Sequence, residues 1–496
     1  MPCVAPLVAQ ADLSGKKGMD GPWGDFMTTP TTSLHAEIAA LLGEGAVVPP
    51  GAAMARFIDE PRRRFHTAAQ AVALPSSVEQ VQALVRWAAA GRIPLIPQGG
   101  NTGLVGGQVP LSGQEVIVSL ERLNRIRSID AATGHMTAEA GVILERAHEA
   151  AEAEGAIFPL WIASQGSARI GGVLASNAGG VQVLAYGNAR ELCLGVEAVT
   201  ADGRLYAGLN TLRKDNTGYD LKDLLIGSEG TLAILTAATL KLFPKPAAYE
   251  TAVVNVAGPE QALQLFYRMK AAAGARLTAF ELMPRFGIDM QLRHSMMSAD
   301  ATASMSPWYV LVEFSYGEAD RQGVLAEALE PAFEAGLTDD AVLAGSLAQR
   351  QQLWAMREQM SEVQSREGAS IKHDVSVDIA DVPQLIAEGT EAAERAVPGI
   401  RPCPFGHLGD GNIHFNFSQP LGADPKAFMA GADAVHDAVY AVVLRLGGSV
   451  SAEHGIGQLK THVLEEVKDP VALDMMRAIK LALDPHRILN PGKVLA

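Results

Sequence analysis

The chain has 496 residues, of which 48% are hydrophobic and 19% are charged, and its formal net charge is −15 at pH 7. A chain of this length exceeds one ordinary hydrophobic core, so we expect a globular protein of two or three domains. The negative charge argues against a surface for nucleic acid or for an anionic membrane, while a local basic site for a small anion stays compatible with it.

The apolar runs and the cysteines bear on the compartment. The longest nearly uncharged apolar run, residues 231–240, is far shorter than a membrane span. The three cysteines, Cys3, Cys193 and Cys403, lack the spacing of a disulfide framework, which indicates a reducing compartment. We therefore expect a cytoplasmic protein without a membrane span.

The first 32 residues are rich in Pro, Gly and Thr and have no helical or strand period, so we expect them to be disordered. They do not resemble a targeting signal, because Lys16 and Lys17 follow the weakly apolar run instead of preceding it. The sequence leaves open whether the chain starts at Met1 or at Met27.

Short helices and strands are predicted next. Ser76-Ser77-Val-Glu79 is a capping box, and apolar residues at helical spacing follow it up to Gly91, which ends the helix. Residues 92–97 predict a short buried strand, and residues 99–107 form a loop that holds five glycines. This pattern indicates a cofactor-binding α/β unit.

The character of the sequence changes at about residue 249. Before it, Asp202-Gly203 predicts a hairpin, and the two prolines in residues 241–246 indicate a domain boundary. After it, strands alternate with amphipathic helices, which predicts α+β packing with helices over one face of an antiparallel sheet. The predicted strands are residues 251–256 and 308–316, and the predicted helices are residues 259–273, 321–335, 382–397 and a last one from residue 470.

A candidate metal site lies on a predicted hairpin. Asp410-Gly411 is a dipeptide typical of a two-residue turn, which would place His407 directly opposite His414. Directly opposed residues have Cβ atoms roughly 4.5–5.5 Å apart, close enough for two imidazoles to bind one metal ion. Side chains alternate along a strand, so Asn416 projects on the same face.

Two features favour a metal over a pair of ordinary polar histidines. The neighbouring residues are apolar, which implies a buried strand where unpaired imidazoles are costly. A second cluster, Ser451-Ala-Glu453-His454-Gly455, offers a carboxylate and a further imidazole. Three protein ligands and an open position are typical of a catalytic metal.

Two glycine-rich stretches, residues 97–107 and 164–180, predict an anion-binding site. Glycines let backbone amides approach a pyrophosphate closely, and successive N–H groups form a nest for an anion. Neither stretch is a Walker A loop, because the Gly-Lys-Ser/Thr ending is missing, and neither is a G-x-G-x-x-G dinucleotide fingerprint.

The order of motifs resembles the FAD-linked oxidase superfamily, which shares the vanillyl-alcohol-oxidase fold. Within it, the chain is similar to the D-2-hydroxy-acid dehydrogenase branch, which contains D-2-hydroxyglutarate and D-lactate dehydrogenases. The resemblance spans roughly residues 45 to 496. The motifs that carry it are PQGGNTGLVGG at 97, GSARIGGVLASNAGG at 166, KDNTGYDLKDLLIGSEGTLAI at 214, GHLGDGNIHFN at 406, SAEHGIG at 451 and NPGK at 490.

The resemblance implies an α+β fold: a bipartite FAD-binding domain of the vanillyl-alcohol-oxidase type, an α+β substrate cap and a C-terminal segment that returns to the flavin. The expected segments are a disordered extension at 1–32, the FAD-binding domain at 33–247, the cap with the metal site at 248–458, and the C-terminal segment at 459–496.

The resemblance also implies the residues that bind FAD. The first loop would bind the pyrophosphate and the second loop the flavin. The segment near residue 230 would lie near the adenosine end, and the C-terminal motif would return to the ring system. No His or Cys lies between Pro97 and Gly107, which favours non-covalent FAD over a covalent link. The expected residues are Pro97, Gly99, Gly100, Asn101, Thr102, Gly103, Gly166, Ser167, Gly171, Gly172, Asn177, Gly179, Glu229, Gly230, Ile234 and Asn490.

Three cap residues are expected to hold a second carboxylate of the substrate. Arg357 and Ser361 share one face of a predicted helix at i, i+4 spacing, and Lys372 follows on a predicted strand, residues 371–377. Solvated charges are the alternative interpretation. The resemblance to the hydroxyglutarate-type dehydrogenases implies that an Arg, a hydroxyl residue and a Lys at these positions bind the distal carboxylate of the substrate. The planar guanidinium of Arg is well matched to a carboxylate.

The predicted activity is an FAD-dependent dehydrogenation of a D-2-hydroxy acid, with D-2-hydroxyglutarate favoured over D-malate. The resemblance implies a divalent metal, with zinc expected, that would be held by His407, His414 and Glu453 and would polarise the substrate. His454 would be the general base, and Asn416 would orient a carboxylate or ligand. The three histidines could exchange these roles.

Other functions remain open on the sequence. They are a D-lactate or glycolate dehydrogenase on the same scaffold, a non-enzymatic flavin- or metal-binding protein, and an oxidase that uses O₂ directly. For a dehydrogenase, the electron acceptor could be an electron-transfer flavoprotein, a quinone or a cytochrome. A homodimer is compatible with the sequence.

Overall fold

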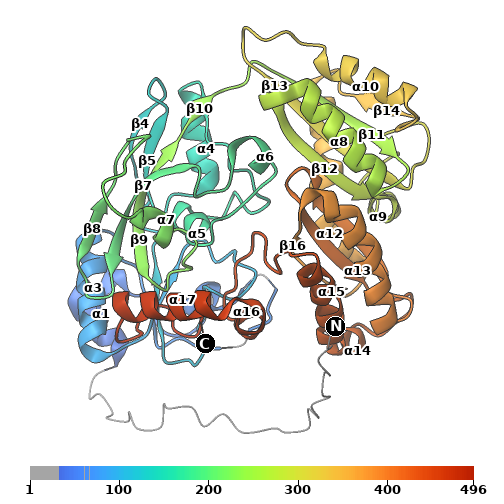
Figure 1. Ribbon diagram of the computed structural model, residues 1–496. Helices are drawn as coiled ribbons and strands as arrows, with labels where there is room; N and C mark the ends of the chain where they lie inside the picture. The colour runs from blue at the N-terminus through green and yellow to red at the C-terminus, as the bar shows by residue number, and fades with distance from the viewer. Residues whose placement is uncertain (1–32, 61, 66, 496) are drawn as a thin grey trace, which may run out of the picture.

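The computed structural model describes residues 33–60, 62–65 and 67–495, so the predicted disorder of residues 1–32 lies outside the described part. The molecule has two lobes (Figure 1). The first lobe contains the N-terminal half of the chain and the C-terminal helix α17 (Pro470–Leu483), and the second contains the chain from residue 248 to about residue 450. A segment that ends at α16 (Thr461–Val467) connects the second lobe back to the first.

A small parallel sheet forms one layer of the first lobe. Its strand order is β1-β3-β2, and α3 (Val78–Gly91) connects β1 to β2. The helix begins one residue later than predicted, because the hydroxyl of Ser77 accepts the N–H of Gln80 at 3.3 Å. The buried face of α3 packs in one hydrophobic cluster with α1. The elements are α1 (Leu34–Leu42), α2 (Ala55–Ile58), β1 (Ala71–Ala73), β2 (Leu95–Gln98) and β3 (Val116–Ser119).

An antiparallel sheet forms the other layer of this lobe, with the strand order β4-β5-β9-β7-β8. Val199 pairs with Leu205, so the hairpin predicted at Asp202-Gly203 is confirmed. The strands are β4 (Ile126–Asp130), β5 (His135–Glu139), β7 (Cys193–Thr200), β8 (Leu205–Gly208) and β9 (Ala233–Lys241), and a separate pair consists of β6 (Ala156–Ile157) and β10 (Phe243–Pro244). The short helices are α4 (Leu144–Ala153), α5 (Ile170–Ala175), α6 (Val183–Tyr186) and α7 (Leu221–Leu225).

An antiparallel sheet of eight strands, ordered β14-β11-β13-β12-β17-β18-β15, organises the second lobe, and β16 pairs with β18 beside β15. The predicted strands and the helix at residues 259–273 are confirmed. The strands are β11 (Ala248–Val256), β12 (Leu277–Pro284), β13 (Trp308–Tyr316), β14 (Ala341–Leu343), β15 (Ser370–Ile371), β16 (Val375–Ser376), β17 (Arg401–His407) and β18 (Asn412–Ser418).

Helices cover both faces of this sheet, so the prediction of helices over one face was wrong. The larger core joins one face to α8 (Pro259–Ala273), α10 (Val324–Glu334), α13 (Val382–Ala396) and α15 (Ala432–Arg445). The smaller core joins the other face to α9 (Arg285–Arg293), α11 (Leu347–Glu358) and α12 (Met360–Arg366), and α14 (Pro425–Ala430) precedes α15. Every residue of β12 is buried, and successive side chains of a strand point to opposite faces of the sheet. Both faces therefore need helices to cover them.

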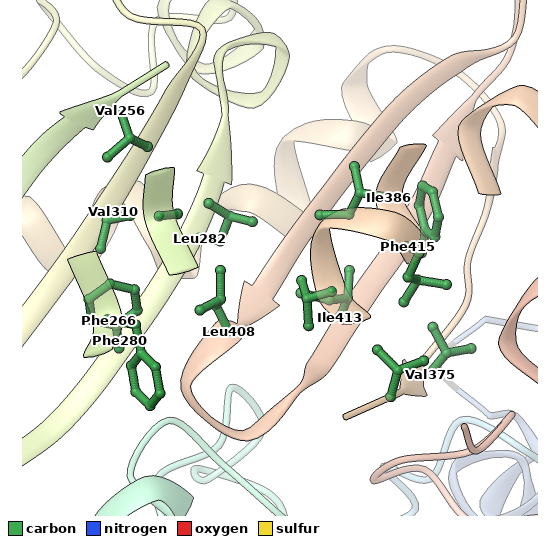
Figure 2. Packing of buried hydrophobic residues seen from close by; sticks show 14 of the residues in the cluster. Val256, Phe266, Phe280, Leu282, Val310, Val375, Ile386, Leu408, Ile413 and Phe415 are labelled. Atoms are coloured by element: carbon green, nitrogen blue, oxygen red, sulfur yellow. The ribbon is translucent and has the colours of Figure 1, made fainter. Parts of the chain in front are cut away.

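The tip of the β17–β18 hairpin is held by the larger core. Leu408 and Ile413 are fully buried and point into the same apolar layer as Phe280 and Leu282 of β12 (Figure 2). Side chains on this face therefore anchor the hairpin, while those on the opposite face project toward α11 and α12. That opposite face carries the predicted site residues.

The C-terminal residues return to the parallel sheet. Leu489 forms a bridge beside Leu95 of β2, and the buried amino group of Lys493 donates a hydrogen bond to Val109 O at 2.8 Å. Residues near the C-terminus are thus part of the first lobe. No helix in the described ranges is long and apolar enough to span a membrane.

The packing of Leu408 generates a stability prediction. Leu408→Ala should lower the free energy of unfolding by about 2–5 kcal/mol, because it removes a buried side chain and leaves a cavity. Urea denaturation followed by intrinsic fluorescence would measure the loss. Leu421→Ala is the matched control, since Leu421 is 82% exposed and its truncation should change stability by no more than about 0.5 kcal/mol. Equal midpoints for the two variants would contradict the role of Leu408.

Candidate active site

A cavity of about 1360 Å³ runs between the two lobes. Its first-lobe wall consists mainly of the two glycine-rich loops, and its second-lobe wall consists of α11, α12, the segment after β15 and the β17–β18 hairpin. The fold therefore brings the predicted cofactor loops and the predicted metal and substrate residues to one chamber.

Most of the predicted cofactor residues line this cavity. The two loops touch each other, because a Cβ added at Gly100 would lie 1.9 Å from Ser167 O. Only glycine permits that approach, and it aligns the loops along one wall. The predicted residues that line the cavity are Pro97, Gly99, Gly100, Asn101, Thr102, Gly103, Gly171, Gly172, Gly179, Glu229 and Gly230.

The first loop has the properties of an anion site. The backbone N–H groups of residues 99–103 donate no hydrogen bond to any residue that the structure describes. Asn101 Oδ1 is likewise buried without a partner in the described chain. A Cβ at Gly172 would meet no atom within 4 Å, so the facing wall leaves free space. Unpaired amides around open space fit the pyrophosphate of a dinucleotide.

Five predicted cofactor residues do not line the cavity. The prediction for Ile234 is corrected, because its side chain is fully buried in β9 and belongs to the core of the parallel layer. Gly166 and Ser167 are exposed on a loop whose neighbouring residues, Gln165 and Ala168, do line the cavity. Motif spacing identifies such loops but does not tell which of their residues face inward.

The two asparagines among these five support the loops from behind. Asn177 has a φ of 50°, and its side-chain oxygen accepts the N–H of Arg190 at 2.9 Å. Asn490 has a φ of 45° and donates to Gly107 O at 2.8 Å and to Glu229 O at 2.7 Å. Both positions need a left-handed backbone, which Asn tolerates better than most residues.

The hairpin register differs from the prediction. His407 pairs with Asn412, and His414 pairs with Phe405, so the turn contains residues 408–411, with a short 3₁₀ turn (Leu408–Asp410) and a left-handed Gly411. The predicted two-residue turn was therefore wrong. The register moved by two residues, which preserves the face of every side chain. His407 and His414 are consequently diagonal neighbours on the same face, with ring centroids 5.4 Å apart.

His407, His414 and Glu453 form a group that could hold a metal ion, with one ligand atom from each all within 4.8 Å of one another. His407 Nε2 lies 3.8 Å from Glu453 Oε1, and His414 Nε2 lies 4.0 Å from Glu453 Oε2. Two imidazole nitrogens and one carboxylate oxygen are a donor set that suits zinc and similar divalent ions.

Glu281 orients His407. The Nδ1–H of His407 donates to Glu281 Oε1 at 2.7 Å, which leaves Nε2 directed at the metal-binding group. Carboxylate–histidine pairs of this kind orient imidazole ligands in metal sites. Burial lowers the pKa of His407, but the carboxylate charge of Glu281 outweighs it and raises the pKa to about 9. Burial raises the pKa of Glu453 to about 7.

His454 is placed to accept a proton. His454 lines the cavity, and its Nδ1 lies 3.5 Å from Asp374 Oδ2. Burial holds the pKa of His454 below its ordinary value, so the imidazole is neutral at neutral pH and can act as a base. The Asp374 carboxylate would stabilise the imidazolium that forms.

Asp374 belongs to a second possible metal group with Glu453 and His454. Its oxygens already accept the N–H groups of Glu453 at 2.9 Å and of His454 at 2.8 Å, and the amide of Asn412 at 3.0 Å. Because these donors occupy the carboxylate, the group with the two hairpin histidines is the better metal site.

The predicted substrate residues meet in the same cavity but differ in their partners. Arg357 is buried and its Nε donates to Glu281 Oε2 at 2.6 Å, so it belongs with the metal-binding group. Lys372 Nζ donates to Ser361 Oγ at 3.1 Å. The predicted single helix is interrupted at Gln359, and Arg357 and Ser361 lie on α11 and α12 respectively.

The segment that carries Lys372 also differs from the prediction. Residues 372–374 interrupt the predicted strand between β15 and β16, which pair with the same strand in one continuous register. Asn416 lies across from this interruption, and its side-chain amide donates to Gln364 Oε1 at 3.0 Å.

Sequence reasoning assigned no role to Glu281 or Asp374. Glu281 is a lone carboxylate in the apolar run Leu277–Pro284, and such a buried charge needs a partner. That was the signal available for it. Asp374 lies in a segment already considered for Lys372, but nothing local indicates that its carboxylate binds amides of residues 453 and 454.

Known proteins share both halves of this architecture. Residues 69–207 match the model of the FAD binding domain, and residues 245–494 match that of the C-terminal domain of FAD linked oxidases. The chain is 39% identical over 432 residues to the D-2-hydroxyglutarate dehydrogenase of Xanthomonas citri pv. viticola, which covers 87% of this chain and 90% of that protein.

More distant likenesses agree. The mitochondrial D-2-hydroxyglutarate dehydrogenase of Rattus norvegicus is 39% identical over 428 residues, or 85% of this chain and 77% of that protein. The structure of p-cresol methylhydroxylase with substrate bound aligns with a TM-score of 0.72 at 16% identity, covering 92% of this chain and 95% of that one. The latter likeness concerns the fold alone.

The contact between the glycine loops generates a prediction about flavin content. Gly100→Ala should lower the ratio of flavin absorbance to protein absorbance in the purified protein, because its Cβ would push the second loop away. Gly45→Ala is the control, since a Cβ there meets no atom within 4 Å. Full flavin occupancy in Gly100→Ala, with unchanged thermal stability, would contradict the proposed fit.

Proposed function

Because the chain belongs to the FAD-linked oxidase family, we propose that it is an FAD-dependent dehydrogenase that oxidises D-2-hydroxyglutarate to 2-oxoglutarate. The observation that carries the proposal is the shared cavity, which has the two glycine-rich loops at one side and His454, the His407–His414–Glu453 group and Lys372 at the other. The 39% identity to a D-2-hydroxyglutarate dehydrogenase over most of the chain supports the substrate class.

The oxidation removes the hydroxyl proton and the hydrogen on C2 of the substrate. When bound, the flavin supplies an acceptor for the C2 hydrogen with its electron pair, and the metal supplies Lewis-acid polarisation of the hydroxyl. His454 takes the hydroxyl proton, and Asp374, 3.5 Å away, stabilises the resulting imidazolium. The low pKa of His454 keeps it available as a base before the reaction.

We infer that the metal is zinc or a similar divalent ion held by His407, His414 and Glu453. Glu281 fixes the orientation of His407 through the Nδ1–H hydrogen bond of 2.7 Å. Arg357 is the second partner of Glu281, at 2.6 Å, so its first role is to balance that carboxylate. This reassigns Arg357 from the distal carboxylate toward the support of the metal group.

Lys372 and Ser361 are the better candidates for the distal carboxylate. Lys372 forms no ion pair with a described carboxylate, and its described hydrogen bonds go to the oxygens of Ser361. A D-lactate or glycolate dehydrogenase, the second candidate on this scaffold, would have no use for a cation there. D-Malate, which keeps a second carboxylate, is the nearest alternative substrate.

Several finer assignments accompany this proposal. The FAD is expected to be non-covalent, and the electrons would pass to a separate acceptor such as an electron-transfer flavoprotein, a quinone or a cytochrome. A homodimer, the domain boundaries at residues 247/248 and 458/459, and the cytoplasmic location stay predictions. The word mitochondrial in the name of the rat relative describes that protein.

A substrate comparison tests the distal site. Lys372→Met should reduce kcat/KM for D-2-hydroxyglutarate about ten- to hundredfold, since a charge-assisted hydrogen bond contributes about 1.5–3 kcal/mol, and change it little for D-lactate. Lys426→Met, on an exposed lysine of the same lobe, is the control. Arg357→Ala should lower kcat/KM for both substrates, because it removes one of the two partners of the buried carboxylate of Glu281. Equal losses for both substrates in Lys372→Met would contradict the assignment.

The same lysine gives a dependence on pH. Burial, followed by the charges of Arg62 and Arg64, lowers the pKa of Lys372 to about 8. Because the cationic form binds the carboxylate, kcat/KM for D-2-hydroxyglutarate should fall as the pH rises through about 8. The ratio of kcat/KM values for D-2-hydroxyglutarate and D-lactate isolates this limb, and a ratio that does not change with pH would contradict it.

A metal analysis tests the other half of the site. His414→Ala should abolish bound divalent metal, measured by atomic absorption, and reduce turnover by orders of magnitude. Its flavin spectrum should stay unchanged, because His414 belongs to the second lobe. His462→Ala, on an exposed histidine, should keep the metal. Full activity after dialysis against a strong chelator would refute the metal proposal.

A further inference from the structure

The loop after α2, residues 59–65 in its described parts, contributes a cation to the cavity from the first lobe. Arg62 is half-buried and lines the cavity together with Ser361, Lys372 and His454 of the second lobe and the segment that follows it. The mechanism above gives this arginine no role. Because it lines the same cavity as the distal-carboxylate residues, it is a candidate for substrate binding.

The buried carboxylate of Glu60 holds the backbone of this loop but forms no ion pair with the Arg62 guanidinium. Glu60 is 3% exposed and accepts the backbone N–H of Arg62 at 2.6 Å, and it also accepts the N–H of Arg64. The guanidinium of Arg62 forms no ion pair with a carboxylate of the described residues. Arg56, on the helix just before the loop, contrasts with it, because its guanidinium pairs with Glu121 at 2.7 Å.

The cavity lining places Arg62 in the same chamber as Lys372, and the charges around it are consistent with that position. Burial, and next the charge of Arg64, lowers the pKa of Arg62 to about 10. The charge of Arg62 in turn contributes to the lowered pKa of Lys372. This agrees with the cavity lining that the two residues share, because charges act on each other most strongly at short range.

Asp374, the second-lobe acid whose charge acts on Arg62, already has other partners. Asp374 attracts Arg62 electrostatically, but its oxygens accept two backbone N–H groups and the amide of Asn412, and it lies against His454. Two partly buried cations, Arg62 and Lys372, line one cavity, and neither forms an ion pair with a carboxylate of the described residues. Buried charges are unfavourable unless an opposite charge compensates them, and here a ligand can supply it.

We propose that Arg62 and Lys372 jointly bind the distal carboxylate of the substrate, so that the substrate is gripped from both lobes. This rests on the proposed function and deepens it, because it assigns a specificity-determining residue to the first lobe. The planar guanidinium can donate two parallel hydrogen bonds to a carboxylate, which the ammonium of Lys372 cannot do alone. A monocarboxylate leaves both cations without a partner and is disfavoured.

Arg62→Gln tests the proposal, and Arg63→Gln is the matched control. Arg63 lies on the same loop, is exposed and does not line the cavity. Two readouts are used: kcat/KM for D-2-hydroxyglutarate and D-lactate, and the dissociation constants of 2-oxoglutarate and pyruvate, followed by the perturbation of the flavin spectrum. Flavin content is measured in each variant.

We expect Arg62→Gln to lose about tenfold or more in kcat/KM for D-2-hydroxyglutarate and in affinity for 2-oxoglutarate, as for the loss of one charge-assisted hydrogen bond. D-Lactate and pyruvate should change by no more than about twofold, Arg63→Gln should behave as wild type, and Arg62→Lys should recover part of the loss. Equal losses for both substrate classes would overturn the proposal. Lowered flavin content in Arg62→Gln would also overturn it, by assigning the guanidinium to the cofactor phosphates.

The double variant tests whether the two cations share one carboxylate. In the Lys372→Met background, Arg62→Gln should cost clearly less than in the wild type, since groups that act on one partner are not additive. Fully independent losses would show two different partners and contradict the proposal. If wild-type protein turns over no D-2-hydroxyglutarate, the proposed function fails instead, and the two dissociation constants still decide whether Arg62 selects dicarboxylates.

Discussion

The carboxylate of Glu281 is the constraint on which both the second lobe and its site depend. It lies on a central strand of the eight-stranded sheet, 1% exposed, where an unpaired charge would be very costly. Its two partners are His407 at 2.7 Å and Arg357 at 2.6 Å. One buried charge therefore holds both the imidazole of His407 and, through Arg357, the helix α11, which lines the cavity.

The proposed catalytic group is assembled across the two lobes. His407 and His414 lie on the hairpin of the second lobe, whereas Glu453 and His454 lie on a segment that is tied to the first. Glu229 makes that connection, because its carboxylate accepts the N–H groups of Ile456 at 2.7 Å and Gly457 at 2.8 Å. Asn490 in turn donates a hydrogen bond to the backbone of Glu229, so the C-terminal segment takes part in positioning the segment that carries His454.

This arrangement has a consequence for the substrate end. The charge of Glu281 is balanced within the protein, and so is that of Asp374, which several N–H groups and His454 surround. The cations Arg62 and Lys372 have no such balance among the described residues. The carboxylate charges near the proposed metal-binding group are thus balanced within the protein, whereas the charges of the two cations are not. This pattern is expected when a ligand supplies the missing negative charge.

The sequence by itself determined the family, the succession of elements and the faces on which key side chains lie. His407, His414 and Asn416 stay on one face of the hairpin although the turn was longer than predicted, because alternation along strands survives a shift of two residues. The glycine loops were equally recognisable, since close backbone approach excludes other residues at Gly100.

Only the tertiary structure decided the partners of the buried charges. Glu281 and His407 are separated by 126 residues, and Glu281 and Arg357 by 76, so no local pattern relates them. No local pattern relates Arg62 to Lys372 either, although both line the cavity. Nor does a local pattern show that Ile234 lies in the hydrophobic core and not in the cavity wall. Electrostatic compensation acts between neighbours in space, and those neighbours exist only once the sheet, its helices on both faces and the two lobes have come together.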